Sequence, residues 1–312
     1  MYYRVAHTCS WFAGLIGLAI VIWYFRPENF VSSLRAVGIG GLFGWLVLTI
    51  SARFLLVETT VLPLRYLGFF LGRADAFWIG WIRTFANQVL PLSGLAVYAH
   101  EVRRKTGIPW SGIVALSTPQ FLLATFALSL VCLFALVNNI DYLDALALSA
   151  LLTTVLIGTG AILIATHIGW VIAKLPIAGI LFAQQSAESF NRISESRQLI
   201  AKIVILHSLA ILIRGGRVWL LFLIVGVDIN WSHALLMIVI AESAALIQLT
   251  PGGMGLREGA IIGSAILLGV SPDVGALVAL IDRLFIIGTT TVLAVPGLFI
   301  IRQNSAEKTN PD

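Results

Sequence analysis

Charged residues are scarce in this chain. They make up 11% of its 312 residues, whereas a soluble globular protein carries roughly 25%. Hydrophobic residues make up 59% of the chain, and its mean hydropathy is +0.96. A chain with so little polar surface cannot face water on all sides. The composition therefore excludes a soluble globular fold and favours an integral membrane protein.

Cysteine is scarce too. Cys9 and Cys132 are the only two in the sequence, and both lie inside apolar runs. Two isolated cysteines give neither a disulfide framework nor the spacing of a metal site. The glycine-rich stretch that begins at Gly252 lacks the Gly-Lys-Ser/Thr of a phosphate-binding loop. The sequence therefore predicts no metal and no cofactor.

The chain instead contains long apolar runs. Each run can cross a hydrocarbon core of about 30 Å as a helix that rises ~1.5 Å per residue, and none alternates with the period of two of a barrel strand. The runs occupy about 9–25, 36–56, 110–137, 145–173, 203–227 and 274–301. They predict an all-α, polytopic transmembrane helix bundle with about six full-spanning helices.

Two further apolar regions are interrupted near their centres. Residues 76–99 are broken by Pro91 and Gly94, and residues 234–270 are broken by Pro251 and three glycines. Proline removes a backbone donor and glycine weakens a helix, and an arm of about 15 residues rises only ~22 Å. Each region is therefore predicted to be a re-entrant helical hairpin, with a kinked full span as the alternative for 76–99. Broken backbone at membrane depth must be buried in protein or line a wet cavity.

The two hairpin regions resemble each other in sequence. Three pairs of residues correspond at an offset of about 160 positions: Gln88 with Gln248, Pro91 with Pro251, and Arg53 with Arg214. The matches predict an internal repeat within one membrane domain, residues 1–312. One copy covers about 36–137 and the other about 203–301, with helix 145–173 and segment 174–202 between them.

The charges of the loops predict an orientation. Loops rich in Lys and Arg stay on the cytoplasmic side, which places 100–105 and 174–202 in the cytoplasm. Residues 138–141 and 227–230 carry no Lys or Arg and are expected outside. One hairpin then enters from each side, as in the inverted repeats of transporters. Both termini are expected in the cytoplasm, and the membrane is expected to be a bacterial or archaeal plasma membrane. The excess of basic residues follows this topology, so nucleic acid is not an expected partner.

Segment 184–200 contains Phe190 and Ile193 among polar residues. It is interpreted either as an amphipathic helix on the cytoplasmic surface or as a plain linking helix.

Ionisable side chains inside the apolar regions need a reason to be there. Each costs about +2.5 to +3.5 kcal/mol on insertion scales. Besides His167, which is interpreted as interfacial, the set comprises six arginines and three acids: Arg53, Arg83, Arg214, Arg217, Arg257, Arg283, Glu242, Glu258 and Asp282. Guanidinium groups match the geometry of a phosphate or pyrophosphate. Because arginines outnumber acids, the set as a whole is expected to contact an anionic ligand.

Internal pairing is the alternative explanation for any single member of this set. Arg257 is then expected to pair with Glu258 or Glu242, and Arg283 with Asp282 or Glu242.

Residues at the hairpin tips complete the candidate substrate-binding set, because free amides at helix ends favour anions. They are Asn87, Gln88, Pro91, Gln248, Pro251, Gly252, Gly253 and Gly255.

The sequence from Pro251 to Gly259, Pro-Gly-Gly-Met-Gly-Leu-Arg-Glu-Gly, resembles the hallmark of the flippase-like family, also called the lysylphosphatidylglycerol synthase transmembrane region. Residues 87–94 are similar to the first motif of that family, although Leu95 and Tyr98 stand where members usually carry an acid and an arginine. Further support lies at Gly269-Val270, Ala276–Leu280, Arg283 and Pro296-Gly297. The resemblance covers about residues 10–301.

The resemblance implies movement of a lipid with a polar headgroup between leaflets, or assistance to an enzyme that modifies such a lipid. The soluble aminoacyl-transferase domain of the full-length synthases has no counterpart in this sequence, so that activity is not expected. The main hypothesis is a transporter that holds an anionic headgroup between the hairpin tips and moves it by rocking one repeat against the other. No ATP motif is present, so movement is expected to be passive or ion-coupled.

Two other functions stay open. One is a non-transporting membrane partner of a lipid-modifying or polysaccharide-assembly enzyme. The other is a membrane-embedded enzyme that acts on an isoprenoid or a phospholipid. This last hypothesis is the least favoured, because no loop carries the paired acids that acid–base catalysis would need.

Overall fold

The computed structural model describes residues 30–143, 145–174, 181–246 and 250–306. Within these ranges the chain is helical, with short connections and no strand. The helices are α2 (Phe30–Tyr66), α3 (Arg73–Val89), α4 (Ser93–Thr106), α5 (Trp110–Val137), α6 (Ala145–Lys174), α7 (Leu181–Glu195), α8 (Arg197–Ile224), α9 (Trp231–Ala245), α10 (Leu256–Leu267) and α11 (Pro272–Ala306), with short 3₁₀ helices η1 (Ile140–Tyr142) and η3 (Pro251–Gly253). The predicted all-α bundle is confirmed.

The described part contains four helices that are long and apolar enough to span a membrane. They are Val37–Tyr66 within α2, Trp110–Val137 (α5), Arg197–Ile224 (α8) and Pro272–Ile301 within α11. Helix α6 has 30 residues, with a shorter apolar stretch at Leu151–His167. Five of the six predicted spans are thus helices, and the run 9–25 lies outside the described residues.

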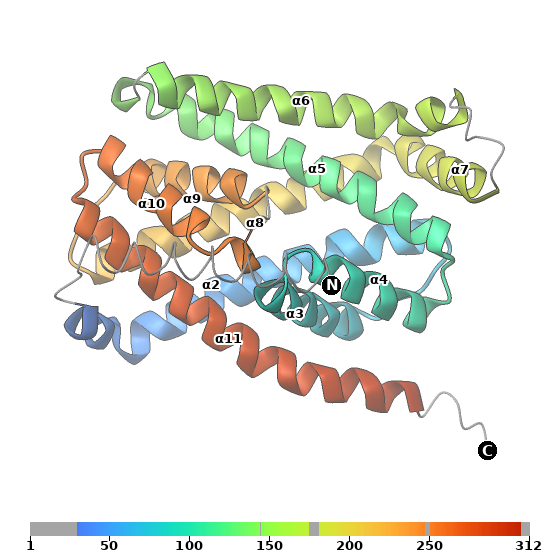
Figure 1. Cartoon of the computed structure of the whole chain (residues 1–312), viewed down its shortest axis with the longest axis horizontal. Coiled ribbons are helices and arrows are strands. Elements are labelled where there is room, and N and C mark those ends of the chain that lie inside the picture. Colours follow the sequence, from blue (N-terminus) through green and yellow to red (C-terminus); the bar gives the residue numbers. More distant parts are fainter. Residues whose placement is uncertain (1–29, 144, 175–180, 247–249, 307–312) are drawn as a thin grey trace, which may run out of the picture.

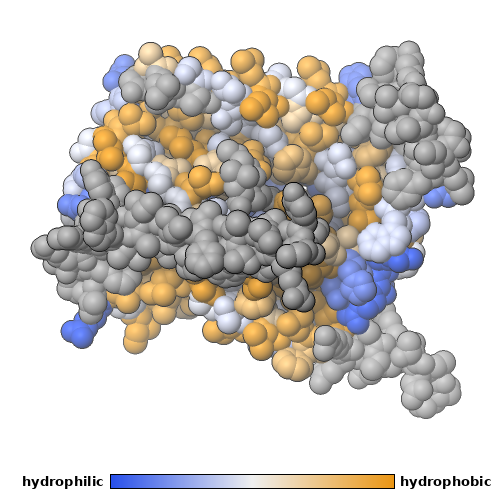
Figure 2. Space-filling model, in the orientation of Figure 1, coloured by the Kyte–Doolittle hydropathy of each residue, from blue (hydrophilic) through white to orange (hydrophobic). Residues whose placement is uncertain are grey.

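The outer surface of the bundle is apolar. Phe43 is 67% exposed, Leu156 71% and Val292 69%, and orange, hydrophobic side chains cover much of the face in Figure 2. A soluble monomer rarely exposes so much contiguous apolar surface. Lipid is the solvent that such a surface matches.

Both interrupted regions form helical hairpins. Helix α3 turns back at Leu90–Leu92 and packs against α4, and α9 packs against α10 in the same way. The α3–α4 hairpin starts and finishes at the end of the bundle where α2 ends and α5 begins, whereas the α9–α10 hairpin starts and finishes at the opposite end (Figure 1). The hairpin interpretation of 76–99 is confirmed, and the kinked full span is wrong.

The helices fall into two quartets of the same order. Helices α2 to α5 have 37, 17, 14 and 28 residues, and α8 to α11 have 28, 15, 12 and 35. Each quartet is therefore long, short, short and long. The quartets meet where α2 packs along α8, a contact that glycines make close. A methyl group at Gly41 would lie 2.7 Å from Cδ1 of Ile224, and one at Gly44 would lie 3.1 Å from Cδ2 of Leu220.

Charge divides the two ends of the bundle. The end where α4 stops and α5 starts is here called the basic end (Figure 1), and hydrophilic side chains gather beside α4 in Figure 2. It carries Arg65, Arg73, Arg103, Arg104, Lys105, Arg192, Arg197 and Lys202. The opposite end carries Asp141, Asp228 and Asp273, with Arg35 as its described arginine. This asymmetry is what the positive-inside rule produces in a polytopic membrane protein.

Helix α7 is packed into the bundle. Phe190 is 1% exposed and Ile193 2%, and the helix contacts both α5 and α6. Ser111 donates a hydrogen bond to Gln185 (3.0 Å), and Ser194 donates one to the carbonyl of Ala165 (3.0 Å). The apolar face of this helix is therefore covered by protein, which favours the interpretation as a linking helix.

The contact between α5 and α6 provides a test of the packing. A methyl group at Gly158 of α6 would overlap the side chain of Ser129, whereas one at Gly160 would meet nothing within 4 Å. We expect Gly158→Ala to destabilise the protein by about 1–3 kcal/mol through overpacking. Thermal unfolding in detergent measures this, with Gly160→Ala as the matched control. Equal unfolding midpoints for the two variants would contradict the predicted contact.

Candidate functional site

The tip of the first hairpin is held by its own side chains. Asn87 Oδ1 accepts a hydrogen bond from the backbone amide of Gly94 (2.8 Å), and the Ser93 hydroxyl donates to the carbonyl of Ala86 (2.7 Å). A side chain at Gly94 would overlap Asn87 and the carbonyl of Arg83, so the close approach of α3 and α4 requires glycine. Pro91 lies in the turn itself. Asn87 thus stabilises the turn that the sequence predicted.

The tip of the second hairpin depends on one arginine. Arg283 of α11 donates hydrogen bonds to the carbonyls of Gly252 (2.8 Å) and Pro251 (3.3 Å). Gly252, Gly253 and Gly255 all have positive φ values, at 58°, 72° and 82°, which residues with a Cβ rarely adopt. Gln248 lies outside the described residues. The glycines of this tip are therefore needed to form it.

Glu258 links this tip to α10. Its Oε2 accepts a hydrogen bond from the amide of Gly255 (2.7 Å), and its Oε1 lies 3.5 Å from Nε of Arg283. Glu258 is 1% exposed and Arg283 5%. Arg283 therefore pairs with Glu258, which corrects its expected pairing with Asp282 or Glu242. The expected pairing of Arg257 with Glu258 is corrected as well. Adjacent residues on a helix point in different directions, so Asp282 and Arg283 reach different neighbours.

The two hairpin tips touch inside the bundle. A methyl group at Gly252 would lie 3.2 Å from Cγ and 3.5 Å from Cα of Gln88, and α3 packs against η3. The amide of Gln88 also lies 3.5 Å from the hydroxyl of Thr290 on α11. Hairpins that enter from opposite ends of the bundle therefore meet near its middle, far from both ends.

A chain of ion pairs runs from the second hairpin to α8 and α11. Arg214 donates to Glu242 (2.9 Å), and Arg257 lies 3.3 Å from the other oxygen of Glu242 and 3.9 Å from Asp282. Arg217 lies 3.0 Å from Asp282. Arg214 and Arg217 are three residues apart and share one face of α8. The expected pair of Arg257 with Glu242 is therefore present.

Asp282 is the most enclosed member of this chain. It is 1% exposed and accepts hydrogen bonds from Trp45 Nε1 (2.9 Å) and Arg217 Nη2 (3.1 Å). Arg217 also stacks over the Trp45 ring at 5.0 Å and donates to Thr49 (3.3 Å). Asp282 thus joins α2, α8 and α11 at one buried point.

Arg53 and Arg83 have a different environment. Arg53 donates to the Thr84 hydroxyl (2.7 Å) and stacks over the Trp81 ring at 4.5 Å, while Arg83 stacks over Tyr98 at 5.0 Å. No acidic side chain of the described ranges forms an ion pair with either arginine. A cation–π contact contributes about 0.5–2 kcal/mol, but it leaves the charge without a counter-ion.

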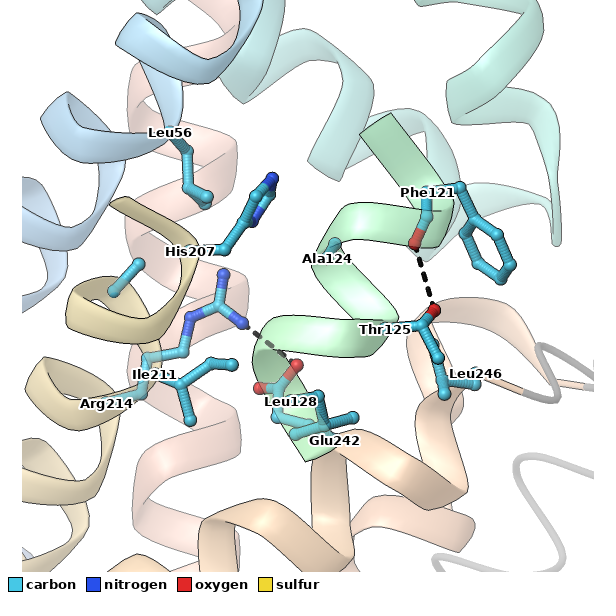
Figure 3. Close-up of a pocket in the computed structure, with 11 residues that line it drawn as sticks. Leu56, Phe121, Ala124, Thr125, Leu128, His207, Ile211, Arg214, Glu242 and Leu246 are labelled. Atoms are coloured by element: carbon cyan, nitrogen blue, oxygen red, sulfur yellow. Dashed lines mark hydrogen bonds and ion pairs between the residues drawn. The ribbon is translucent and has the colours of Figure 1, made fainter. Parts of the chain in front are cut away.

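A cavity opens beside these charges. It has a volume of about 100 Å³, enough for several waters or part of a headgroup, and Arg214, Glu242 and His207 form its polar side. The rest of its lining is mainly apolar: Leu56, Phe121, Ala124, Thr125, Leu128, Ala210, Ile211 and Leu246. Figure 3 shows His207 beside the Arg214 guanidinium, which reaches across to Glu242. An amphiphile with a polar end and an apolar body would match this lining.

Several residues of this region were not predicted as candidates. They are Trp45, Thr49, Trp81, Thr84, His207 and Thr290. Trp45 and Thr49 precede Arg53 at spacings of four, and His207 precedes Arg214 by seven, so both groups follow one helix face. This periodicity was available in the sequence. His167, in contrast, lies exposed on α6 and bonds its own helix at the carbonyl of Leu163.

Comparison with known proteins identifies the family. The family described as the lysylphosphatidylglycerol synthase TM region matches residues 10–294. The chain belongs to this family. It is also 26% identical over 305 residues to a UPF0104 membrane protein of Methanothermobacter thermautotrophicus, with 89% of this chain and 88% of that protein covered. No solved structure matches the chain.

The part of the chain that matches the lysylphosphatidylglycerol synthase TM family includes the charged cluster. The matched range contains both hairpins and every arginine of the cluster. In the described ranges, His, Cys, Asp and Glu form no group of three or more that could hold a metal ion. The described cluster combines six arginines with three acids, so its formal charge is positive.

Proposed function

We propose that the protein moves or presents a membrane lipid with an anionic, phosphate-bearing headgroup. The observation that carries this proposal is the largely buried cluster of six arginines and three acids, next to an amphipathic cavity lined by α2, α5, α8 and the end of α9. Uncompensated charge is costly inside a membrane. A phosphate on a lipid supplies both the missing negative charge and an apolar body.

The order of the helices supports a mechanism of alternating access. The two quartets α2–α5 and α8–α11 have hairpins that enter from opposite ends and touch at Gln88 and Gly252. We propose that they form an inverted repeat, with the basic end in the cytoplasm and α11 ending there. Rocking one quartet against the other would expose the site to each leaflet in turn.

A reconstituted scrambling assay tests the proposal. Purified protein in liposomes is given fluorescent analogues of phosphatidylcholine, phosphatidylglycerol and phosphatidic acid, and a membrane-impermeant quencher reports movement between leaflets. We expect the anionic lipids to move faster in the presence of the protein. Arg214→Gln and Arg257→Gln should each reduce this rate by roughly tenfold or more, since a hydrogen bond to a charged group contributes about 1.5–3 kcal/mol.

Arg197→Gln is the matched control, because Arg197 is an exposed residue of the same helix as Arg214. Size-exclusion chromatography checks that each variant is folded. If no anionic lipid moves in wild-type liposomes, the transporter proposal is wrong, and a partner of a lipid-modifying or polysaccharide-assembly enzyme becomes the better hypothesis. Covalent change in the added lipid would instead indicate an enzyme.

A further inference from the structure

The buried cluster has two halves: four arginines that lie beside its three acids, and two arginines, Arg53 and Arg83, that do not. The excess positive charge is unevenly shared between these halves. Arg214, Arg217, Arg257 and Arg283 all lie beside Glu242, Glu258 or Asp282. Four positive charges against three negative charges leave +1 in this half. Arg53 and Arg83 add two charges with no acidic partner in the described ranges, which gives a formal total of +3. Two thirds of the excess therefore lies on α2 and the first hairpin.

The two arginines without an acidic partner in the described ranges lie close to further positive charge and to each other. Arg53 is close enough to Arg83 and Arg214 for unfavourable charge interactions with both, and His207 is close enough to Arg83 and Arg214. Such repulsion is strong where little water can screen it. A bound anion would offset this repulsion, because it adds a favourable interaction with each of the positive charges.

Unused hydrogen-bonding groups lie in the same place. His207 Nε2 and Trp81 Nε1 are both buried without a hydrogen-bond partner. His207 lines the cavity beside Arg214 (Figure 3), and the Trp81 ring lies under the Arg53 guanidinium. Buried polar groups are normally paired, so each of these nitrogens has capacity for a ligand oxygen.

From this arrangement we infer that Arg53 and Arg83, with Arg214 and His207 beside them, bind a phosphate group carrying two or more negative charges. A phosphomonoester carries about −1.5 to −2 at neutral pH, and a diphosphate carries at least as much, so either neutralises most of the excess. A phosphodiester headgroup with one charge neutralises only a third of it. Arg217 and Arg283, in contrast, hold the fold through Asp282 and the second hairpin tip. The inference rests on the proposed function, because it specifies the ligand of the same site.

Calorimetric titration of the protein in detergent tests the inference. Three probes are used: short-chain phosphatidic acid, which is a phosphomonoester, short-chain phosphatidylglycerol, which is a phosphodiester, and inorganic pyrophosphate. We expect wild type to bind phosphatidic acid at least tenfold more tightly than phosphatidylglycerol. Arg53→Gln and Arg83→Gln should each remove this preference. Tighter binding of phosphatidic acid than of pyrophosphate supports a lipid-borne phosphate, and equal binding supports a free diphosphate as the source.

Arg65→Gln is the matched control. Arg65 lies on the same helix as Arg53, stacks over the Phe70 ring at 5.4 Å and has no acidic partner in the described ranges, but it is exposed at the basic end. Its replacement should leave the preference unchanged, and Arg53→Lys, which keeps the charge, should retain part of it. Equal affinities of wild type for the two lipids, or an unchanged preference in both glutamine variants, would overturn the inference.

The two proposals can fail separately. If phosphatidylglycerol moves between leaflets but wild type shows no preference for phosphatidic acid, the inference is wrong and the proposed function stands. If the preference is present but no lipid moves, the site binds a phosphate and the transport proposal is wrong.

Discussion

Asp282→Asn is expected to destabilise the protein more than any other single substitution in the charged cluster, by about 3–5 kcal/mol. The carboxylate is 1% exposed and receives hydrogen bonds from Trp45 and Arg217, and Arg257 lies 3.9 Å away. A neutral amide leaves the buried guanidinium of Arg217 without a counter-ion. We expect the thermal unfolding midpoint in detergent to fall by roughly 10 °C.

Asp273→Asn provides the matched control for this experiment. Asp273 is an exposed residue in the first turn of the same helix, α11, and its replacement should change the midpoint little. Trp45→Phe distinguishes the contribution of Trp45 from that of Arg217, because it removes the hydrogen bond from Trp45 to Asp282 and keeps the ion pair with Arg217. We expect Asp282→Asn to unfold roughly 10 °C below the control. If the two midpoints instead differ by less than about 2 °C, Asp282 does not hold α2, α8 and α11 together.

A covalent link between the hairpin tips is expected to stop lipid movement. A Cβ atom at Gly252 would lie 3.5 Å from Cα of Gln88, so we expect a disulfide to form between Gln88→Cys and Gly252→Cys. If the quartets rock against each other, the tips must separate, and the link prevents it. In the scrambling assay we expect the oxidised double variant to lose at least nine tenths of the wild-type rate, and reduction to restore it.

The single variants separate the effect of the link from the strain of the substitutions. Gly252 has a φ of 58°, so Gly252→Cys alone is expected to reduce stability and rate under both redox conditions. Only the double variant should respond to oxidation. If the fully cross-linked double variant transports lipid as fast as the same variant under reducing conditions, the tips do not need to separate.

The local sequence was sufficient to predict the hairpins. Pro91 and Pro251 each break an apolar region whose arms are too short to cross a membrane, and both regions turn back in the structure. The α7 segment was harder to interpret. Its pattern of Phe190 and Ile193 among polar residues fits a helix on a membrane surface as well as one packed on α5 and α6, because both environments cover an apolar face.

The candidate site was predicted as a set of residues without its connections. Each ionisable residue could be recognised, because charge inside an apolar run is costly wherever the partner lies. Of the pairings, the sequence predicted only that of Arg257 with Glu242, as one of two alternatives, and the others could not be predicted. Arg283 pairs with Glu258, 25 residues before it in the chain, and Arg217 pairs with Asp282, 65 residues after it.

The scarcity of charge by itself determined that this protein belongs in a membrane, because no fold can hide so much apolar surface from water. The breaks at Pro91 and Pro251, likewise local, determined where the chain turns back. Only the tertiary structure decided how the few charges are used. Ion pairs depend on distances between helices that are remote in sequence, and those distances leave Arg53 and Arg83 without an acidic partner in the described ranges.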